Sequence, residues 1–266
     1  MLRPRIIPCL LVHQGGLVKT VRFASPKYVG DPINAVKIFN EKEADELIVL
    51  DIDATVEGRE PNFRLIAQFA AECRMPLCYG GGITTPEQAK RIIGLGVEKV
   101  ALSAAAIANP DLVTQIAAGV GRQSVVVVLD ARKKMLGGWE VCTHQGRRGS
   151  GRSPEELARQ FEARGAGEIV INSIDRDGEM QGYDLALARK VRESIGIPMT
   201  VLGGAGSLDH VGELLESCGV LGAAAGSLFV FKGIYRAVLI NYPAPAVKEA
   251  LIRRALPATH APARSE

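Results

Sequence analysis

Hydrophobic residues gather in eight short runs along the chain, and segments with helical periodicity separate these runs. The runs are almost continuously apolar, which is typical of parallel strands that are buried on both faces. Eight strand–helix alternations in one chain favour a closed (β/α)8 barrel over an open doubly wound sheet. The predicted strands cover residues 5–11, 46–52, 76–80, 99–103, 124–130, 168–174, 198–203 and 220–226.

Polar residues directly before proline mark helix starts between these strands. Thr85-Pro86, Asn109-Pro110 and Ser153-Pro154 each place a capping side chain before a proline at the first helical position. From Ala244 onward the composition changes to alternating Pro and Ala. We therefore predict one barrel domain over residues 1–243, followed by a short helix and a disordered end over residues 244–266.

The two halves of the chain resemble each other. Residues 46–49 match residues 168–171, and the same offset of 122 residues places Gly81-Gly82 on Gly203-Gly204. Residues 8–11 match residues 127–130. Similarity that keeps its order predicts a barrel with approximate twofold symmetry, built from two (β/α)4 halves. Chance similarity among βα units is the alternative.

Composition narrows the classes of function. The chain is 47% hydrophobic and 23% charged, as globular proteins are. Its 32 basic and 29 acidic residues nearly balance, and aromatic residues make up only 5%, so we expect neither nucleic acid nor a membrane as partner. The cysteines form no CxxC pair, and the histidines lack metal-ligand spacing and are expected on the surface or in loops. We expect a cytoplasmic protein without metal or cofactor.

Small residues follow several predicted strands at the end where such barrels bind phosphate. Backbone N–H groups approach a phosphate closely where side chains are absent. Two phosphate sites on opposite sides of the barrel mouth would suit a long substrate with a phosphate at each end. The alternative is that these residues only turn the chain. The candidates are Gly82, Ser103 and Ala104 in the first half, and Gly203, Gly204, Gly226 and Ser227 in the second.

Carboxylates at strand ends are candidates for acid–base chemistry. Asp130 ends the apolar run 124–130, and Asp51 lies near the end of the second strand. Lys19 lies in the long loop predicted after the first strand, from which it could reach over the mouth to a phosphate. The alternatives are that the carboxylates cap the following helices and that the lysine is solvated.

Four charged residues lie at the starts of predicted strands, at the opposite end of the barrel. They are Arg5, Glu46, Lys99 and Glu168. Charges near a barrel axis are costly unless they are paired, so two cations and two anions could neutralise one another as a ring. From spacing alone, rim charges that face water are the favoured alternative.

Several motifs together resemble the cyclase subunit of imidazole glycerol phosphate synthase. They include RIIPCL (5–10), GGGI (80–83), VVVLDA (126–131) and GAGEIVINSIDRDG (165–178), within a resemblance that covers residues 1–240. The resemblance implies a twofold-symmetric barrel with a glutaminase docked on its bottom face. In that family, ammonia passes a charged gate, travels along the barrel axis and reacts with a bisphosphorylated ribonucleotide. The products are imidazole glycerol phosphate, for histidine synthesis, and an aminoimidazole ribotide.

The resemblance also implies roles for individual residues. It identifies the four strand-start charges as the ammonia gate, and it assigns catalytic positions to Asp130, Lys19 and Asp51. It adds Asp177 and Gly178 to the second phosphate site. Leu11 departs from the pattern, because the family carries a catalytic Asp there, the symmetry mate of Asp130. A leucine exchanges no proton, and losing a positioned acid or base costs about 10²–10⁴ in rate, so we expect an impaired cyclase.

A second set of motifs resembles a divergent paralogue branch of the same family. It includes CLL (9–11) and PKYVGDPIN (26–34). That branch is associated with amidino-sugar formation in bacterial surface polysaccharide, and the resemblance implies that barrel and glutaminase supply ammonia to a separate sugar amidotransferase. A phosphosugar isomerase is a third hypothesis. Such an enzyme needs paired acids after strands one and five, which Leu11 argues against, and it needs no charged gate.

Overall fold

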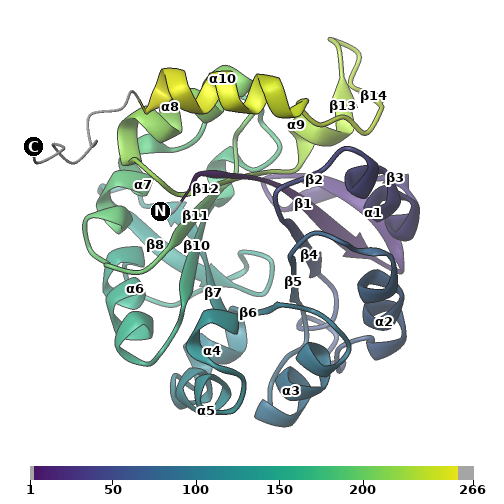
Figure 1. Ribbon diagram of the computed structural model, residues 1–266. Helices are drawn as coiled ribbons and strands as arrows, with labels where there is room; N and C mark the ends of the chain where they lie inside the picture. Colours follow the sequence, from purple (N-terminus) through teal and green to yellow (C-terminus); the bar gives the residue numbers. More distant parts are fainter. Residues whose placement is uncertain (1–2, 257–266) are drawn as a thin grey trace, which may run out of the picture.

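The computed structural model describes residues 3–256, which form a closed barrel of parallel strands surrounded by helices (Figure 1). Each barrel strand pairs with its neighbours in parallel, and the pairing of β10 with β7 closes the circle. The predicted (β/α)8 barrel is therefore confirmed. Its strands are β1 (Arg5–His13), β4 (Leu47–Asp51), β5 (Leu77–Gly80), β6 (Lys99–Leu102), β7 (Val125–Lys133), β10 (Glu168–Ser173), β11 (Met199–Leu202) and β12 (Gly222–Ala225).

Helices cover the outside of the barrel. Thr85 and Ser153 cap theirs as predicted, but the prediction for Asn109 is wrong, because it ends one helix while Pro110 precedes the next. Within residues 3–256 no helix has the length and apolarity to cross a membrane. The helices are α1 (Pro32–Glu41), α2 (Phe63–Glu72), α3 (Pro86–Gly94), α4 (Ala104–Ala108), α5 (Asp111–Val120), α6 (Pro154–Ala163), α7 (Leu185–Arg192), α8 (Leu208–Cys218), α9 (Ser227–Val230) and α10 (Pro245–Ala255).

Two antiparallel ribbons extend from the barrel, and the first occupies the segment after the first strand, for which a long loop is predicted. β2 (Gly16–Val21) and β3 (Ala24–Gly30) continue from β1, and β8 (Trp139–Thr143) and β9 (Arg148–Gly149) continue from β7. β1 and β7 are the first strands of the two predicted halves, so the ribbons repeat with the halves. A third, short hairpin comprises β13 (Phe231–Lys232) and β14 (Ala237–Val238).

Alternation along the strands divides the apolar residues into two clusters. On β1, Ile6 and Leu10 pack outward among helix residues, whereas Ile7 and Cys9 belong to a separate cluster inside the barrel. Because successive side chains of a strand point to opposite faces, Arg5 and Leu11 lie on the interior side at the two ends of this cluster. This alternation places the charged residues inside the barrel at the amino ends of the strands, and the residues that line the cavity at the carboxyl ends.

The C-terminal helix α10 packs against the same barrel. Lys248 Nζ lies 2.6 Å from Asp45 Oδ1, and Arg254 lies 2.9 Å from Asp209 on α8. The Tyr242 hydroxyl donates to the Ile6 carbonyl at 2.7 Å. Lys248 and Arg254 thus attach the segment after residue 243 to the residues before β4 and to α8, and Tyr242 attaches the segment just before it to β1. The predicted disordered end falls mainly on residues 257–266, which lie outside the described residues.

Candidate functional site

A cavity of about 1050 Å³ opens at the carboxyl ends of the barrel strands. Strand ends and the segments that follow them line it, as expected for a barrel of this class. The structure brings together in this cavity all of the residues proposed for catalysis or phosphate binding. They are Leu11, Lys19, Asp51, Gly82, Ser103, Ala104, Asp130, Asp177, Gly178, Gly203, Gly204, Gly226 and Ser227.

Two glycines of this cavity have backbones that a side chain would disrupt. Gly82 has φ +71°, and a Cβ atom there would lie 2.5 Å from the Arg59 carbonyl oxygen. Gly204 has φ +110°, and a Cβ atom there would lie 2.2 Å from the Gly182 carbonyl oxygen. The close approach of two chain segments thus requires glycine at both positions. Each half contains one of the two positions, and because β5 and β11 are four strands apart in the barrel, they lie on opposite sides of the mouth.

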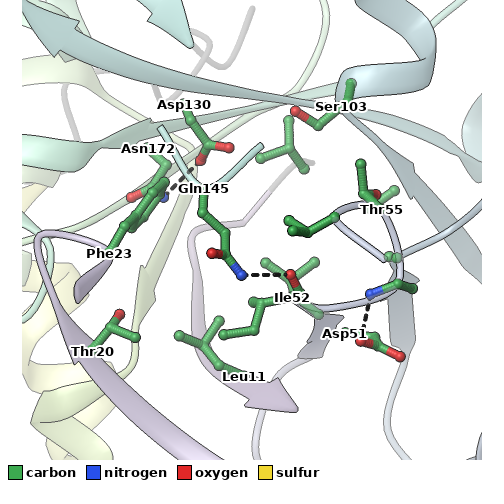
Figure 2. Close-up of a pocket in the computed structure, with 18 of the residues that line it drawn as sticks. Leu11, Thr20, Phe23, Asp51, Ile52, Thr55, Ser103, Asp130, Gln145 and Asn172 are labelled. Atoms are coloured by element: carbon green, nitrogen blue, oxygen red, sulfur yellow. Dashed lines mark hydrogen bonds between the residues drawn. The ribbon is translucent and has the colours of Figure 1, made fainter. Parts of the chain in front are cut away.

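Asp130 and Asn172 form a polar pair at the ends of two neighbouring strands. Asn172 Nδ2 donates to Asp130 Oδ1 at 2.9 Å, as Figure 2 shows. Burial raises the pKa of Asp130 to about 6, although the hydrogen bond from Asn172 opposes this and Asp177 adds to it. The side-chain oxygen Oδ1 of Asn172 is buried without a hydrogen-bond partner among the described residues. The pair therefore combines a carboxyl group whose pKa lies close to neutral pH with an amide oxygen that accepts no hydrogen bond within the described residues.

Leu11 and Leu50 occupy the equivalent place in the first half. Leu11 on β1 lies in register with Leu50 on β4, just as Asp130 lies in register with Asn172. Both leucines pack against the apolar cluster inside the barrel. The first half thus presents hydrocarbon to the cavity where the second half presents a carboxylate and an amide.

Lys19 lies elsewhere than predicted. It belongs to β2 rather than to a loop, and it is only 5% exposed. Its Nζ atom donates to the Cys9 carbonyl at 2.5 Å, and burial lowers the pKa of the ammonium. A side chain at Gly226 would collide with this ammonium group. The lysine therefore lies inside the site, beneath the second phosphate-binding candidate, and neither reaches over the mouth nor faces water.

Asp51 holds the turn that follows β4. Its Oδ1 atom accepts hydrogen bonds from the backbone N–H groups of Asp53 and Ala54, at 3.0 and 3.1 Å.

Asp177, in the second half, accepts a hydrogen bond from the Thr20 hydroxyl at 2.7 Å, and burial raises the pKa of Asp177. Asp177 thereby ties the β2–β3 ribbon to the second half.

Gln145 and His13 also line the cavity, and the expectation that the histidines lie on the surface or in loops is wrong for His13, which lies on β1. Gln145, between β8 and β9, lies between Asp130 and Ile52 and donates from Nε2 to the Ile52 carbonyl at 3.0 Å (Figure 2). His13 lines the cavity with its Nδ1 atom 2.7 Å from Asp53 Oδ1. Both contacts join segments that are distant in sequence, so no local sequence motif predicts them. Within residues 3–256 no cluster of three or more His, Cys, Asp or Glu side chains could hold a metal ion.

The four charges at the strand starts form a closed ring at the opposite pole. Arg5 pairs with Glu46 and, at 2.7 Å, with Glu168. Lys99 Nζ lies 2.7 Å from Glu46 and 2.9 Å from Glu168. The two glutamate side chains are only 4% and 6% exposed, so the alternative of rim charges that face water is wrong. Charges of opposite sign alternate around the ring.

The two cations of the ring keep Glu168 ionised. Burial alone would raise the pKa of Glu168, but Lys99 and Arg5 hold it at about 2. The Thr200 hydroxyl donates to Glu168 Oε1 at 2.6 Å and adds to the same effect. The glutamate is therefore ionised at neutral pH and remains bound to both cations.

Comparison with known proteins shows the family of this chain. A family model described as "Histidine biosynthesis protein" matches residues 5–235. The chain is 56% identical over 252 residues to a Leptospira borgpetersenii protein named "Putative imidazole glycerol phosphate synthase subunit HisF", covering 94% of this chain and 99% of that protein. The chain belongs to the HisF family. As a HisF-family barrel, it carries Leu11 in place of the acid that the motif predicts at that position.

Two further relatives have numbered HisF names. A HisF-family protein of Vibrio vulnificus, named hisF3, is 56% identical over 250 residues, covering 94% of this chain and 96% of that protein. A Pseudomonas aeruginosa relative, named hisF2, is 54% identical over 243 residues, covering 91% of this chain and 97% of that protein. Both names describe subunits of imidazole glycerol phosphate synthase.

Proposed function

We propose that this HisF-family barrel is the synthase subunit of a cytoplasmic glutamine amidotransferase. A glutaminase docks on the face that carries the ionic ring, and its ammonia passes the ring and the barrel interior to a phosphorylated ligand at the mouth. The observation that carries the proposal is the closed ring of Arg5, Glu46, Lys99 and Glu168. A ring of buried ion pairs is weak evidence for a role in stability, because desolvation offsets much of the attraction.

The barrel interior supports a route for a small neutral molecule. Its lining between the two poles is uncharged and includes the small residues Cys9, Cys78, Ala101 and Ala224. Moving an ion through such surroundings is costly, whereas ammonia carries no charge. The route ends beside Asn172, whose side-chain oxygen Oδ1 can accept an N–H group. The lining therefore favours ammonia over ammonium as the species that moves.

The mouth supports a ligand with phosphate groups. Gly82 and Gly204 line the cavity at the ends of β5 and β11, four strands apart in the barrel, where backbone N–H groups can serve as donors to a bound anion. In the family reaction, a bisphosphorylated ribonucleotide and ammonia give imidazole glycerol phosphate and an aminoimidazole ribotide. We propose that this chain performs that reaction slowly, because Leu11 replaces one of two proton-transfer groups.

A second candidate function follows from the pairing of Leu11 with Leu50. With hydrocarbon at both positions, the first half lacks the carboxylate–amide pair that the second half places at its strand ends. We propose as the alternative that the barrel and its glutaminase deliver ammonia to a separate sugar amidotransferase, for acetamidino-sugar synthesis in lipopolysaccharide O-antigen. In this alternative the ring keeps its role and the cyclase activity is absent.

One pair of assays tests the proposal and separates the two candidates. Purified protein receives ammonium chloride and the bisphosphorylated ribonucleotide, and loss of substrate absorbance is followed. Turnover supports the synthase, and its absence supports delivery to another enzyme. In both cases Lys99→Ala should change the fraction of hydrolysed glutamine whose nitrogen reaches a product, measured with the glutaminase present. Unchanged coupling would remove the proposed role of the ring.

A further inference from the structure

We propose that His13, oriented by Asp53, is a proton-transfer residue that takes over work lost at Leu11. The inference rests on the proposed synthase function and concerns the same cavity. His13 follows Leu11 by two positions on β1, so both side chains point to the same side of the strand. Both residues line the cavity. The imidazole thus lies one step further toward the mouth than the missing carboxylate.

Asp53 holds the imidazole in a defined orientation. Its Oδ1 atom lies 2.7 Å from His13 Nδ1, and its Oδ2 atom accepts the backbone N–H of Gln14 at 2.7 Å. The Asp53 carboxylate is buried, and the His13 side chain is 29% exposed. A carboxylate at Nδ1 fixes the tautomer that carries its proton there, which leaves Nε2 as the acceptor.

The second half shows that the fold does not require this histidine. Asp175, the counterpart of Asp53, accepts the backbone N–H of Lys133 at 2.7 Å. This bond repeats the one from Gln14 to Asp53, but Arg132 occupies the position of His13 and donates instead to the Gly146 carbonyl. The carboxylate clamp on the backbone therefore forms without an imidazole. A purely structural role leaves the choice of histidine at position 13 unexplained.

The proposed step is a proton transfer during addition of ammonia. The lone pair of ammonia forms a bond to an electrophilic carbonyl carbon of the ligand, and the C=O electron pair moves onto the oxygen. The new ammonio group gives one proton to His13 Nε2, and the imidazolium returns that proton to the alkoxide. The product is a neutral carbinolamine, and both protein groups end in their starting state. Asp130 remains available for proton transfers on the opposite side of the ligand.

The test compares His13→Gln with His144→Gln, a change at a second histidine that lines the cavity but pairs with no carboxylate. Each protein receives ammonium chloride and the bisphosphorylated ribonucleotide. We expect turnover by the wild type, a fall in kcat on the order of 100-fold in His13→Gln with an unchanged KM, and little change in His144→Gln. In a Leu11→Asp background the loss caused by His13→Gln should be smaller, because the carboxylate provides a second route.

Two further measurements keep the proposal separate from the function on which it rests. Adding the ribonucleotide to protein with ¹⁵N-labelled histidine should shift the Nε2 resonance of His13. Equal kcat values for His13→Gln and the wild type, or a wild type without turnover, would overturn the role of His13. Neither result would affect the ring, because Lys99→Ala tests it through glutamine coupling. Loss of folding in His13→Gln, seen by circular dichroism without rescue by His13→Asn, would assign His13 a structural role instead.

Discussion

The two half-barrels share a scaffold and differ in chemistry. Both carry an antiparallel ribbon after their first strand, and in both a carboxylate, Asp53 or Asp175, accepts a backbone N–H of that segment. At the strand ends that face the cavity, the second half pairs Asp130 with Asn172, whereas the first half pairs Leu11 with a second leucine.

This difference separates what the fold needs from what the reaction needs. The shared carboxylates satisfy backbone donors, and a buried donor left without a partner is costly. The strand-end side chains face a cavity, so their exchange leaves the packing between strands and helices intact. The two halves therefore share this backbone contact although their strand-end side chains differ.

The largest expected effect comes from restoring the acid in the first half. Leu11→Asp should raise the ammonia-dependent turnover of the ribonucleotide by about 10²-fold, because a carboxylate then lies across the mouth from Asp130. The matched control is Leu11→Asn, which is polar and of the same size but exchanges no proton. Equal rates for the two variants would show that the ligand lies out of reach of position 11.

The next effect concerns the stability that the ionic ring at the amino ends of the strands gives to the folded protein. Glu168→Gln should lower the free energy of unfolding by about 3 kcal/mol at pH 7, because Arg5 and Lys99 lose a charged partner. The pKa of Glu168 is lowered to about 2, so its stabilising effect is present above pH 4.5 and fades as the pH falls toward 2. Urea unfolding at pH 7 and pH 3 should therefore show a smaller gap at pH 3, and a constant gap would contradict the assignment.

A smaller effect of opposite sign is expected at Asp130. The pKa of Asp130 is raised to about 6, so its ionisation is easier in the unfolded chain and the folded state loses stability as the pH rises from about 4 to 6. Asp130→Asn should therefore raise the free energy of unfolding at pH 7 by about 1–2 kcal/mol while it abolishes turnover. Urea unfolding should show no such gain at pH 3.5.

The smallest effect converts the second half toward the first. Asn172→Leu removes the hydrogen bond that opposes the rise in the pKa of Asp130, so that pKa should move above 6 by about half to one pH unit. A ¹³C titration of the Asp130 carboxyl group measures the change. Leu50→Asn, at the equivalent place beside Leu11, should leave the pKa of Asp130 unchanged.

The sequence predicts those features that local pattern or residue order determines. Buried strands appear as continuous apolar runs, and the cavity residues lie at strand ends, where a barrel brings them together. The ribbons were missed because segments such as 16–21 and 24–30 contain glycine and polar residues without a clear alternation. The contacts of Gln145 with Ile52 and of His13 with Asp53 depend on tertiary placement, which no local spacing encodes.

Isotope retention tests the central claim most directly. The barrel and its glutaminase are given glutamine labelled with ¹⁵N in the amide, together with an excess of unlabelled ammonium chloride, and the aminated product is analysed by mass spectrometry. If nitrogen enters at the ionic ring and crosses the barrel, the product should retain most of the ¹⁵N, and Lys99→Ala should lower the retained fraction. A product whose nitrogen matches the unlabelled ammonium in solution would contradict the account.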